Sequence, residues 1–203
     1  MSKNAELYKK LLGSMGFLSE SDREKALFVL THPREAAQAD WARQRRNKEL
    51  AHEALSALAD SDLYEAAWNR TNEKVESAAS DQAGVAALPQ PARVFYVIYV
   101  YNLEVFDGGL CQYFVNSSRE LAPLLSDCLG EVNALDHKTL FDGFVRENGI
   151  DVNDLSSFKS NSVEAYLSQT KRYPFETFDA AFGELPALAT YLIPYVRANL
   201  SAF

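Results

Sequence analysis

The stretch Glu104-Val-Phe-Asp-Gly-Gly-Leu-Cys-Gln-Tyr-Phe-Val-Asn116 sets polar side chains among large apolar residues, around a pair of glycines. The polar residues are Glu104, Asp107, Gln112 and Asn116. Polar groups in apolar sequence are costly to bury unless each one has a hydrogen-bond partner. The stretch therefore indicates either a structural hydrogen-bond network or a ligand site, and both interpretations stay open at this point. Gly108-Gly109 predicts a break in the backbone between the two halves of the stretch.

The run just before it, Val94-Phe-Tyr-Val-Ile-Tyr-Val-Tyr-Asn-Leu-Glu-Val-Phe106, decides the secondary-structure class. Its β-branched and aromatic residues favour a strand, whereas its length and Pro91 at its start equally fit a helix buried on all sides. Helical signals dominate elsewhere, because Pro33 suits a first helical turn and residues 62–79 carry apolar side chains at helical intervals. Residues 83–91 end in two prolines and predict a connector.

The composition is that of an ordinary globular protein, since 47% of its 203 residues are hydrophobic and 24% are charged. No secretory signal is visible, and the longest apolar run is much shorter than the about 20 residues that span a membrane. Cys111 and Cys128 are too few for a disulfide framework and predict buried thiols in a reducing compartment. We expect a bacterial-type cytoplasmic protein that binds no membrane.

The net charge of -8 is unevenly distributed along the chain. Residues 1–60 hold 10 Lys/Arg and 9 Asp/Glu, whereas residues 61–203 hold 10 Lys/Arg and 19 Asp/Glu, a net charge of -9. Such a field repels nucleic acid and attracts basic proteins, although an acidic surface also serves solubility alone. We predict an N-terminal helical segment over residues 1–60 and an acidic helical domain over residues 61–203.

One series of carboxylates is denser than the rest of the acidic residues. It comprises Asp127, Glu131, Asp136, Asp142, Glu147, Asp151 and Asp154. Carboxylates at i and i+4 advance about 6 Å along a helix, whereas duplex DNA carries one charge per about 1.7 Å of its axis. A single helix is therefore too sparse to imitate DNA, and several elements have to converge on one face. We expect these residues to form a binding surface for a basic protein.

The sequence does not favour a metal site, a cofactor or a catalytic centre. The histidines are His32, His52 and His137. They lie far apart, with no second histidine or cysteine at i+3 or i+4. Gly108-Gly109 lacks the Lys-Ser/Thr of a phosphate loop, and Cys111 has no histidine near it in the chain. Glu104 and Asp107 can share a helical face, but acid–base catalysis also needs a cleft and a polarising partner.

The motif resembles the signature of a known family. Glu104-x-x-Asp-Gly-Gly-x-x-Gln-Tyr-Phe-x-Asn-Ser117 is similar to the pattern Glu-x-x-Asn-Gly-Gly-Phe-x-Gln-Phe-Phe-x-Asn-Ser of the bacterial DNA-mimic protein (DMP) family. The resemblance covers about residues 61–203 and includes tail positions, namely Phe178, Asp179, Tyr195, Arg197, Asn199 and Phe203. The chain departs from the signature at Asp107, where asparagine is usual, and at Leu110, where an aromatic residue is usual.

The resemblance implies an all-α fold, a multi-helix globular bundle with an N-terminal helical extension, and hence a buried helix at residues 94–106. One characterised type of member is a dimer whose acidic surface imitates duplex DNA and binds a helix-turn-helix repressor. The signature itself is mostly apolar and rich in glycine, so we expect it to maintain the fold. This structural role falls to Glu104, Asp107, Gly108, Gly109, Gln112, Phe114 and Asn116. In this role Glu104, Gln112 and Asn116 cross-link helices and cap a helix start.

We therefore predict a non-enzymatic acidic interaction protein, a DNA mimic that binds a basic DNA-binding protein or transcription factor, with a homodimer among the expected assemblies. We expect no direct contact with nucleic acid. One alternative is an immunity or antitoxin-like protein that masks a basic toxin. Another is a small-ligand-binding or hydrolytic protein that uses the Glu104–Asn116 motif as its site.

Overall fold

The computed structural model describes residues 20–160 and 162–203, and all regular elements in these ranges are helices. The predicted all-α class is thereby confirmed. By compactness the chain divides between Glu49 and Leu50, whereas the sequence suggested a division after residue 60. In the first unit, α2 (Glu20–Thr31) packs against α3 (Pro33–Glu49), and Pro33 begins α3 as predicted.

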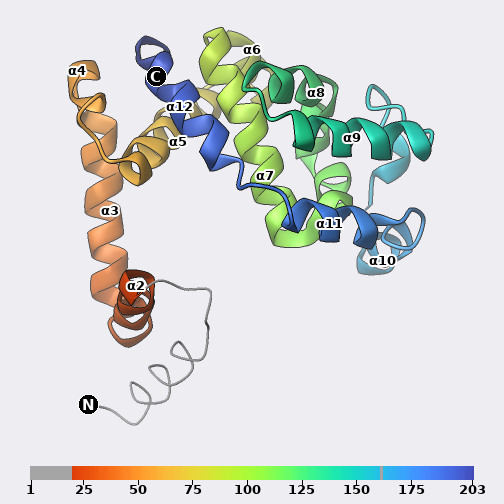
Figure 1. The fold of residues 1–203 in the computed structure, drawn as a ribbon, viewed down its shortest axis with the longest axis horizontal. Coiled ribbons are helices and arrows are strands. Elements are labelled where there is room, and N and C mark those ends of the chain that lie inside the picture. The colour runs from red at the N-terminus through yellow and green to blue at the C-terminus, as the bar shows by residue number, and fades with distance from the viewer. Residues whose placement is uncertain (1–19, 161) are drawn as a thin grey trace. The chain divides into compact units, whose positions relative to one another are not determined.

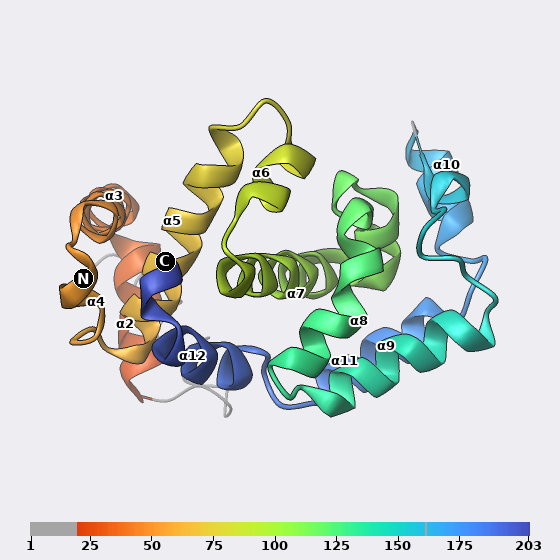
Figure 2. The ribbon, with the colours of Figure 1, turned by 90° about the horizontal axis from the view of Figure 1, so that it is seen from above.

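The second unit is built around α7 (Gln90–Val115), with the other helices arranged about it (Figures 1 and 2). The other elements are α4 (His52–Leu55), α5 (Asp60–Glu76), α6 (Asp81–Ala87), η1 (Ser117–Leu121), α8 (Ala122–Glu131), α9 (Leu135–Glu147), η2 (Ser156–Phe158), α10 (Val163–Gln169), α11 (Phe175–Gly183), α12 (Ala189–Ala198) and η3 (Leu200–Ala202), where η denotes a 3₁₀-helix. Helices α5, α8, α11 and α12 all contact α7, so this helix forms the centre of the hydrophobic core.

The run whose composition favoured a strand is helical because protein surrounds it. Phe95, Val97 and Ile98 are fully buried in α7, and Pro91 lies in its first turn, where no helical N–H is needed. Within the described ranges, α7 is the one helix long and apolar enough to cross a membrane by length and composition. Its apolar environment in this structure is the packed interior of the second unit.

The glycine pair interrupts α7, as the sequence predicted. Gly109 has φ 77° and ψ 176°, a conformation that is essentially restricted to glycine. Beyond the break, the chain resumes a helix up to Val115, and Phe114 packs against Phe158 with ring centroids 5.1 Å apart.

The connector predicted at residues 83–91 was wrong. These residues include most of α6, a short helix whose N-cap is Ser80. The Ser80 hydroxyl accepts a hydrogen bond from the N–H of Ala83 at 3.2 Å, which satisfies a free donor of the first turn. Pro89 follows the helix and does not interrupt it.

Candidate functional site

The carboxylate of Glu104 lies at the centre of the motif. Its Oε2 accepts hydrogen bonds from Gln112 Nε2 at 2.9 Å and Asn116 Nδ2 at 2.8 Å. Its Oε1 accepts one from Ser118 Oγ at 2.8 Å. Glu104 precedes the break in α7, Gln112 follows it, and Ser118 belongs to η1. The carboxylate therefore joins three segments of the chain through neutral donors.

Some details of this network differ from the prediction. Asn116 precedes η1 but makes no side-chain capping hydrogen bond, because its amide donates to Glu104 instead. The hydrogen bond from Ser118 to Glu104 was not predicted. Ser118 follows Asn116 by only two residues, so its hydroxyl was a possible donor to the same carboxylate. Asp107 is exposed and lies outside the network. Asp107 and Glu104 therefore do not form the carboxylate pair that their spacing on a helix allowed.

A second contact forms at the glycine break, where α11 meets α7. Oδ1 of Asp179 accepts a hydrogen bond from the backbone N–H of Leu110 at 2.9 Å. A Cβ atom on Gly109 would overlap the Asp179 carboxylate, so glycine is required for this approach. Burial raises the pKa of Asp179; the Leu110 N–H opposes this effect, and the charge of Glu176 adds to it.

The tail positions that resemble the family also make structural contacts. The hydroxyl of Tyr195 donates to the carboxylate of Glu131, which connects α12 to α8. Arg197 Nε donates to Asp60 Oδ1 at 3.0 Å, which connects α12 to the start of α5. Phe203 is buried in the core. These residues hold the C-terminal end of the chain in place.

A cavity of about 140 Å³ lies beside Glu104, between α6, α7 and η1. Tyr96, Val100 and Glu104 line it from α7, and their spacing of four residues places them on one helical face. Asp81 of α6 and Glu120 of η1 add two more carboxylates. The cavity is smaller than the roughly 300–1,000 Å³ of typical small-molecule sites. Its size and its residues fit one side chain better than a drug-sized ligand.

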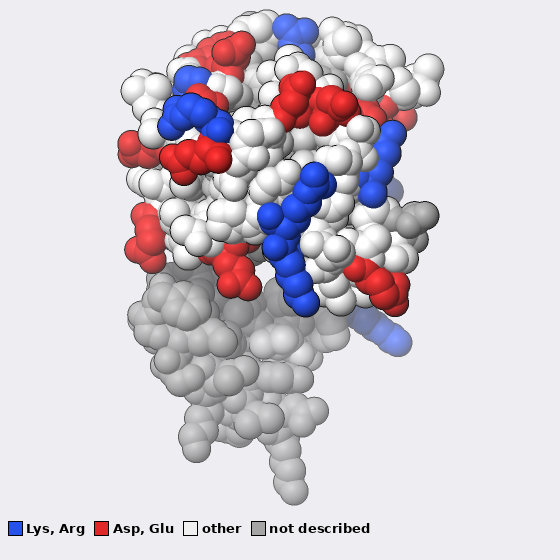
Figure 3. Space-filling model, turned by 90° about the vertical axis from the view of Figure 1, so that its right-hand side faces the viewer, with Lys and Arg blue, Asp and Glu red and all other residues white. Residues whose placement is uncertain are grey.

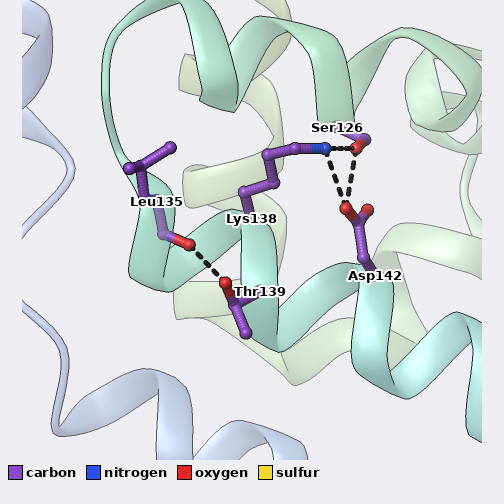
Figure 4. A network of polar contacts seen from close by, with 5 residues as sticks. All are labelled: Ser126, Leu135, Lys138, Thr139 and Asp142. Atoms are coloured by element: carbon purple, nitrogen blue, oxygen red, sulfur yellow. Dashed lines mark hydrogen bonds and ion pairs between the residues drawn. The ribbon is translucent and has the colours of Figure 1, made fainter.

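The acidic series lies on two packed helices, α8 and α9, and in the loop after α9. Within it, Asp142 is paired with a cation of its own helix. Lys138 Nζ lies 2.8 Å from Asp142 Oδ2 and also contacts Ser126, whose hydroxyl donates to the same oxygen at 3.0 Å (Figure 4). The neighbouring Thr139 donates to the carbonyl of Leu135 at 2.8 Å (Figure 4). Asp142 is therefore partly neutralised within the protein.

Two further members of the series also have partners in the chain. Glu131 accepts hydrogen bonds from Gln90 and Tyr195, so it connects α8 to the start of α7 and to α12. Glu147 lies 3.9 Å from Arg146, and both side chains are about three-quarters exposed. An exposed pair at this distance contributes little to stability, so Glu147 stays available to a partner.

The remaining four carboxylates are exposed. Asp151 and Asp154 accept hydrogen bonds from backbone N–H groups two residues further on, at 2.9 Å and 3.1 Å, and thus shape the loop after α9. Hydrogen bonds from Ser156 lower the pKa of Asp154. Asp127 lies on α8, and Asp136 lies in the first turn of α9, where the helix dipole favours a negative charge.

Cys111, Cys128 and His137 are buried in the second unit. The thiols of Cys111 and Cys128 are free, and burial raises their pKa values to about 11 and about 12. Nε2 of His137 donates to the carbonyl of Pro186 at 2.8 Å, and burial lowers the pKa of this imidazole. Within residues 20–160 and 162–203, no group of three or more His, Cys, Asp or Glu side chains could hold a metal ion.

The family model for DMP19-like proteins matches residues 86–199, more than half of the chain. The chain belongs to the DMP19-like family. Membership suggests a DNA-mimic protein, and it confirms the resemblance over a shorter stretch than residues 61–203. No curated protein and no solved structure matches the chain significantly.

The matched region of this DMP19-like protein contains both the Glu104 network and the Asp179 contact. The two departures from the signature have structural explanations. Asp107 is exposed, so a carboxylate is tolerated there without a partner. Leu110 is fully buried, so an aliphatic side chain keeps the position apolar.

The face of the DMP19-like protein shown in Figure 3 carries acidic and basic side chains interspersed. Carboxylates form small groups on this face, separated by lysine and arginine side chains and by uncharged surface. A continuous acidic ridge is therefore absent from the described residues visible in this view. A DNA-like surface would have to lie on another face or use carboxylates spaced more widely.

Proposed function

We propose that this DMP19-like protein is a DNA mimic whose acidic second unit occupies the DNA-binding surface of a basic protein, such as a transcription factor. Family membership supports DNA mimicry in general. The charge of the second unit supports a basic partner, since residues 50–203 hold 21 Asp/Glu and 10 Lys/Arg, a net charge of -11. On the scale of duplex DNA this charge corresponds to about 19 Å of helix axis.

The excess of carboxylates is the observation that carries the proposal. Lys138, Arg146 and Arg197 pair with Asp142, Glu147 and Asp60, respectively. Even if each of the 10 basic side chains neutralised one carboxylate, 11 of the 21 would keep their charge. These charges repel nucleic acid and attract basic surfaces, at rates and affinities that fall with added salt. We place the protein in the cytoplasm, where it would meet DNA-binding proteins.

Within the acidic series we assign the partner contact first to the exposed carboxylates that form no ion pair with a described lysine or arginine. Asp127 and Asp136 lie on the packed helices α8 and α9, and Asp151 lies in the loop that follows. Asp142 and Glu131 contribute less, because each is already bound within the chain.

The proposal is tested by capturing proteins from a bacterial lysate on the immobilised full chain and identifying them by mass spectrometry. We expect DNA-binding proteins that are released by high salt or by excess duplex DNA. A captured set without DNA-binding proteins, or one that is indifferent to salt, would contradict the proposal.

A matched pair of triple variants locates the surface. The first variant removes Asp127, Asp136 and Asp151 by change to Asn. The second variant changes Glu164, Glu176 and Glu184 to Gln, so both variants lose the same amount of negative charge. These three residues are exposed and lie in α10, in α11 and at the C-cap of α11, respectively. We expect the first variant to lose more of the captured protein. Equal losses would show that net charge alone attracts the partner and would overturn the assignment to α8 and α9.

A further inference from the structure

The cavity beside Glu104 has a charged rim and an apolar floor. Both α6 and η1 contact α7, and the cavity lies between these three elements. Asp81 and Glu120 are exposed at the rim, whereas Val85 and Tyr96 are buried at the floor. The cavity thus presents exposed carboxylates beside buried apolar side chains.

Among the described residues that line the cavity, none is a lysine, arginine or histidine. Arg119, the nearest cation along the chain, donates through Nη1 to the carbonyls of Val115 at 2.6 Å and Asn116 at 2.8 Å. The three donors to Glu104 are all uncharged, so its negative charge is solvated but not neutralised by them. Together with Asp81 and Glu120, Glu104 therefore gives the cavity a negative potential.

The apolar floor is suited to the aliphatic part of a long basic side chain. Val85, Val100 and Leu121 offer apolar contacts for an alkyl stem. The ring of Tyr96 can attract a cation through its face or accept an alkyl chain. Tyr96 is itself held in place by Trp68, since the two rings stack with centroids 5.6 Å apart.

We propose that this cavity receives one arginine or lysine side chain of the basic partner protein. The alkyl stem lies against the floor, and the charged head lies among Asp81, Glu104 and Glu120. This inference rests on the proposed function, because it names one contact by which the partner is held. The volume of about 140 Å³ suits a single side chain and is below the range of small-molecule sites.

The test is an NMR titration of the isotope-labelled full chain with the capped peptide acetyl-Gly-Arg-Gly-amide. We expect saturable shifts of the backbone signals of Gln82, Val100 and Leu121, all of which line the cavity. The matched peptide with norleucine in place of arginine carries the same alkyl stem without charge. We expect no saturable shift with it, since the carboxylates would gain no partner.

Two double variants with equal change of charge separate the cavity from general attraction. Asp81→Asn with Glu120→Gln should weaken binding of the arginine peptide by between about two-fold and about 25-fold, because it removes two exposed ion pairs that are each worth up to about five-fold. Asp127→Asn with Asp136→Asn should leave it within about two-fold. Circular dichroism checks that both variants are folded. Glu104 is kept intact in both, because its replacement would disturb the surrounding network.

Equal binding of the norleucine peptide, or equal weakening by both double variants, would overturn the inference. Its failure is distinguishable from failure of the proposed function. Capture of DNA-binding proteins from the lysate without peptide binding at the cavity would overturn this inference alone. Peptide binding at the cavity without capture of DNA-binding proteins would overturn the proposed function alone.

Discussion

Asp179 and Leu110 are joined by a hydrogen bond of 2.9 Å although 69 residues separate them in the chain. The bond lies where α7 is interrupted, so Leu110 stands at the start of a new helical segment with a backbone N–H that needs a partner. The carboxylate from α11 supplies that partner. The break in α7 is therefore stabilised by a helix distant in sequence, and the same bond holds α11 in its place.

Replacing Gly109 by alanine should destabilise the fold by about 3 kcal/mol or more. The positive φ of 77° with ψ 176° is strained for any residue with a Cβ, and the added methyl group would overlap the Asp179 carboxylate. Urea unfolding followed by circular dichroism measures the free energy of unfolding. Gly183→Ala is the matched control, because no atom lies within 4 Å of the added Cβ. A loss at Gly109 no greater than at Gly183 would contradict this account.

The variant Asp179→Asn should change how stability depends on pH. The folded-state pKa of Asp179 is raised above 3.8 by burial, so the protonated form is favoured in the native state. The stability from this group is fully present below pH 3.8 and is lost as the pH rises through the folded-state pKa. The difference in free energy of unfolding, wild type minus variant, should therefore fall as the pH rises above 3.8.

The exposed neighbour Glu176 provides the control for this pH dependence. Its charge is a smaller cause of the raised Asp179 pKa than burial is, so Glu176→Gln should keep most of the slope. The free energy of unfolding is obtained from urea unfolding at several pH values for the wild type, Asp179→Asn and Glu176→Gln. Parallel curves for the wild type and Asp179→Asn would mean that Asp179 ionises alike in the folded and unfolded chain.

The variant Glu104→Gln should lower the free energy of unfolding by about 1–3 kcal/mol. An amide oxygen accepts hydrogen bonds more weakly than a carboxylate does, so the bonds from Gln112 and Asn116 lose their charge assistance even when the new amide nitrogen turns toward Ser118. Asp107→Asn, three residues further on and exposed, should change stability by less than about 0.5 kcal/mol. If Glu104→Gln leaves the urea midpoint unchanged, the network does not stabilise the fold as argued.

Local signals predicted much of the central helix and part of the network. Pro91 and the length of the apolar run were compatible with a helix at residues 94–106, and Gly108-Gly109 marked its break. Gln112 and Asn116 were recognised as polar partners because they lie in the same apolar stretch as Glu104. Gln112 and Asn116 are four residues apart, so they lie on one side of the helical segment after the break and can both reach the carboxylate of Glu104.

The parts that were not predicted depend on tertiary packing or on a weaker local signal. The bond between Asp179 and Leu110 requires α11 to pack on α7, which no local pattern reveals. The pairing of Lys138 with Asp142 could have been found, because i and i+4 residues of opposite charge are neighbours on a helix. Ser80 likewise carried a capping signal for α6 that the following prolines obscured.

Acidification should destabilise the protein through His137. This imidazole is buried, its Nε2 donates to the Pro186 carbonyl, and burial lowers its pKa below 6.5. The unfolded chain therefore binds the proton more readily, and stability is lost as the pH falls below 6.5. In His137→Gln this part of the pH dependence should vanish, whereas the exposed His32→Gln should retain it. Melting temperatures between about pH 5 and pH 7 provide the measurement, and an unchanged slope in His137→Gln would contradict the prediction.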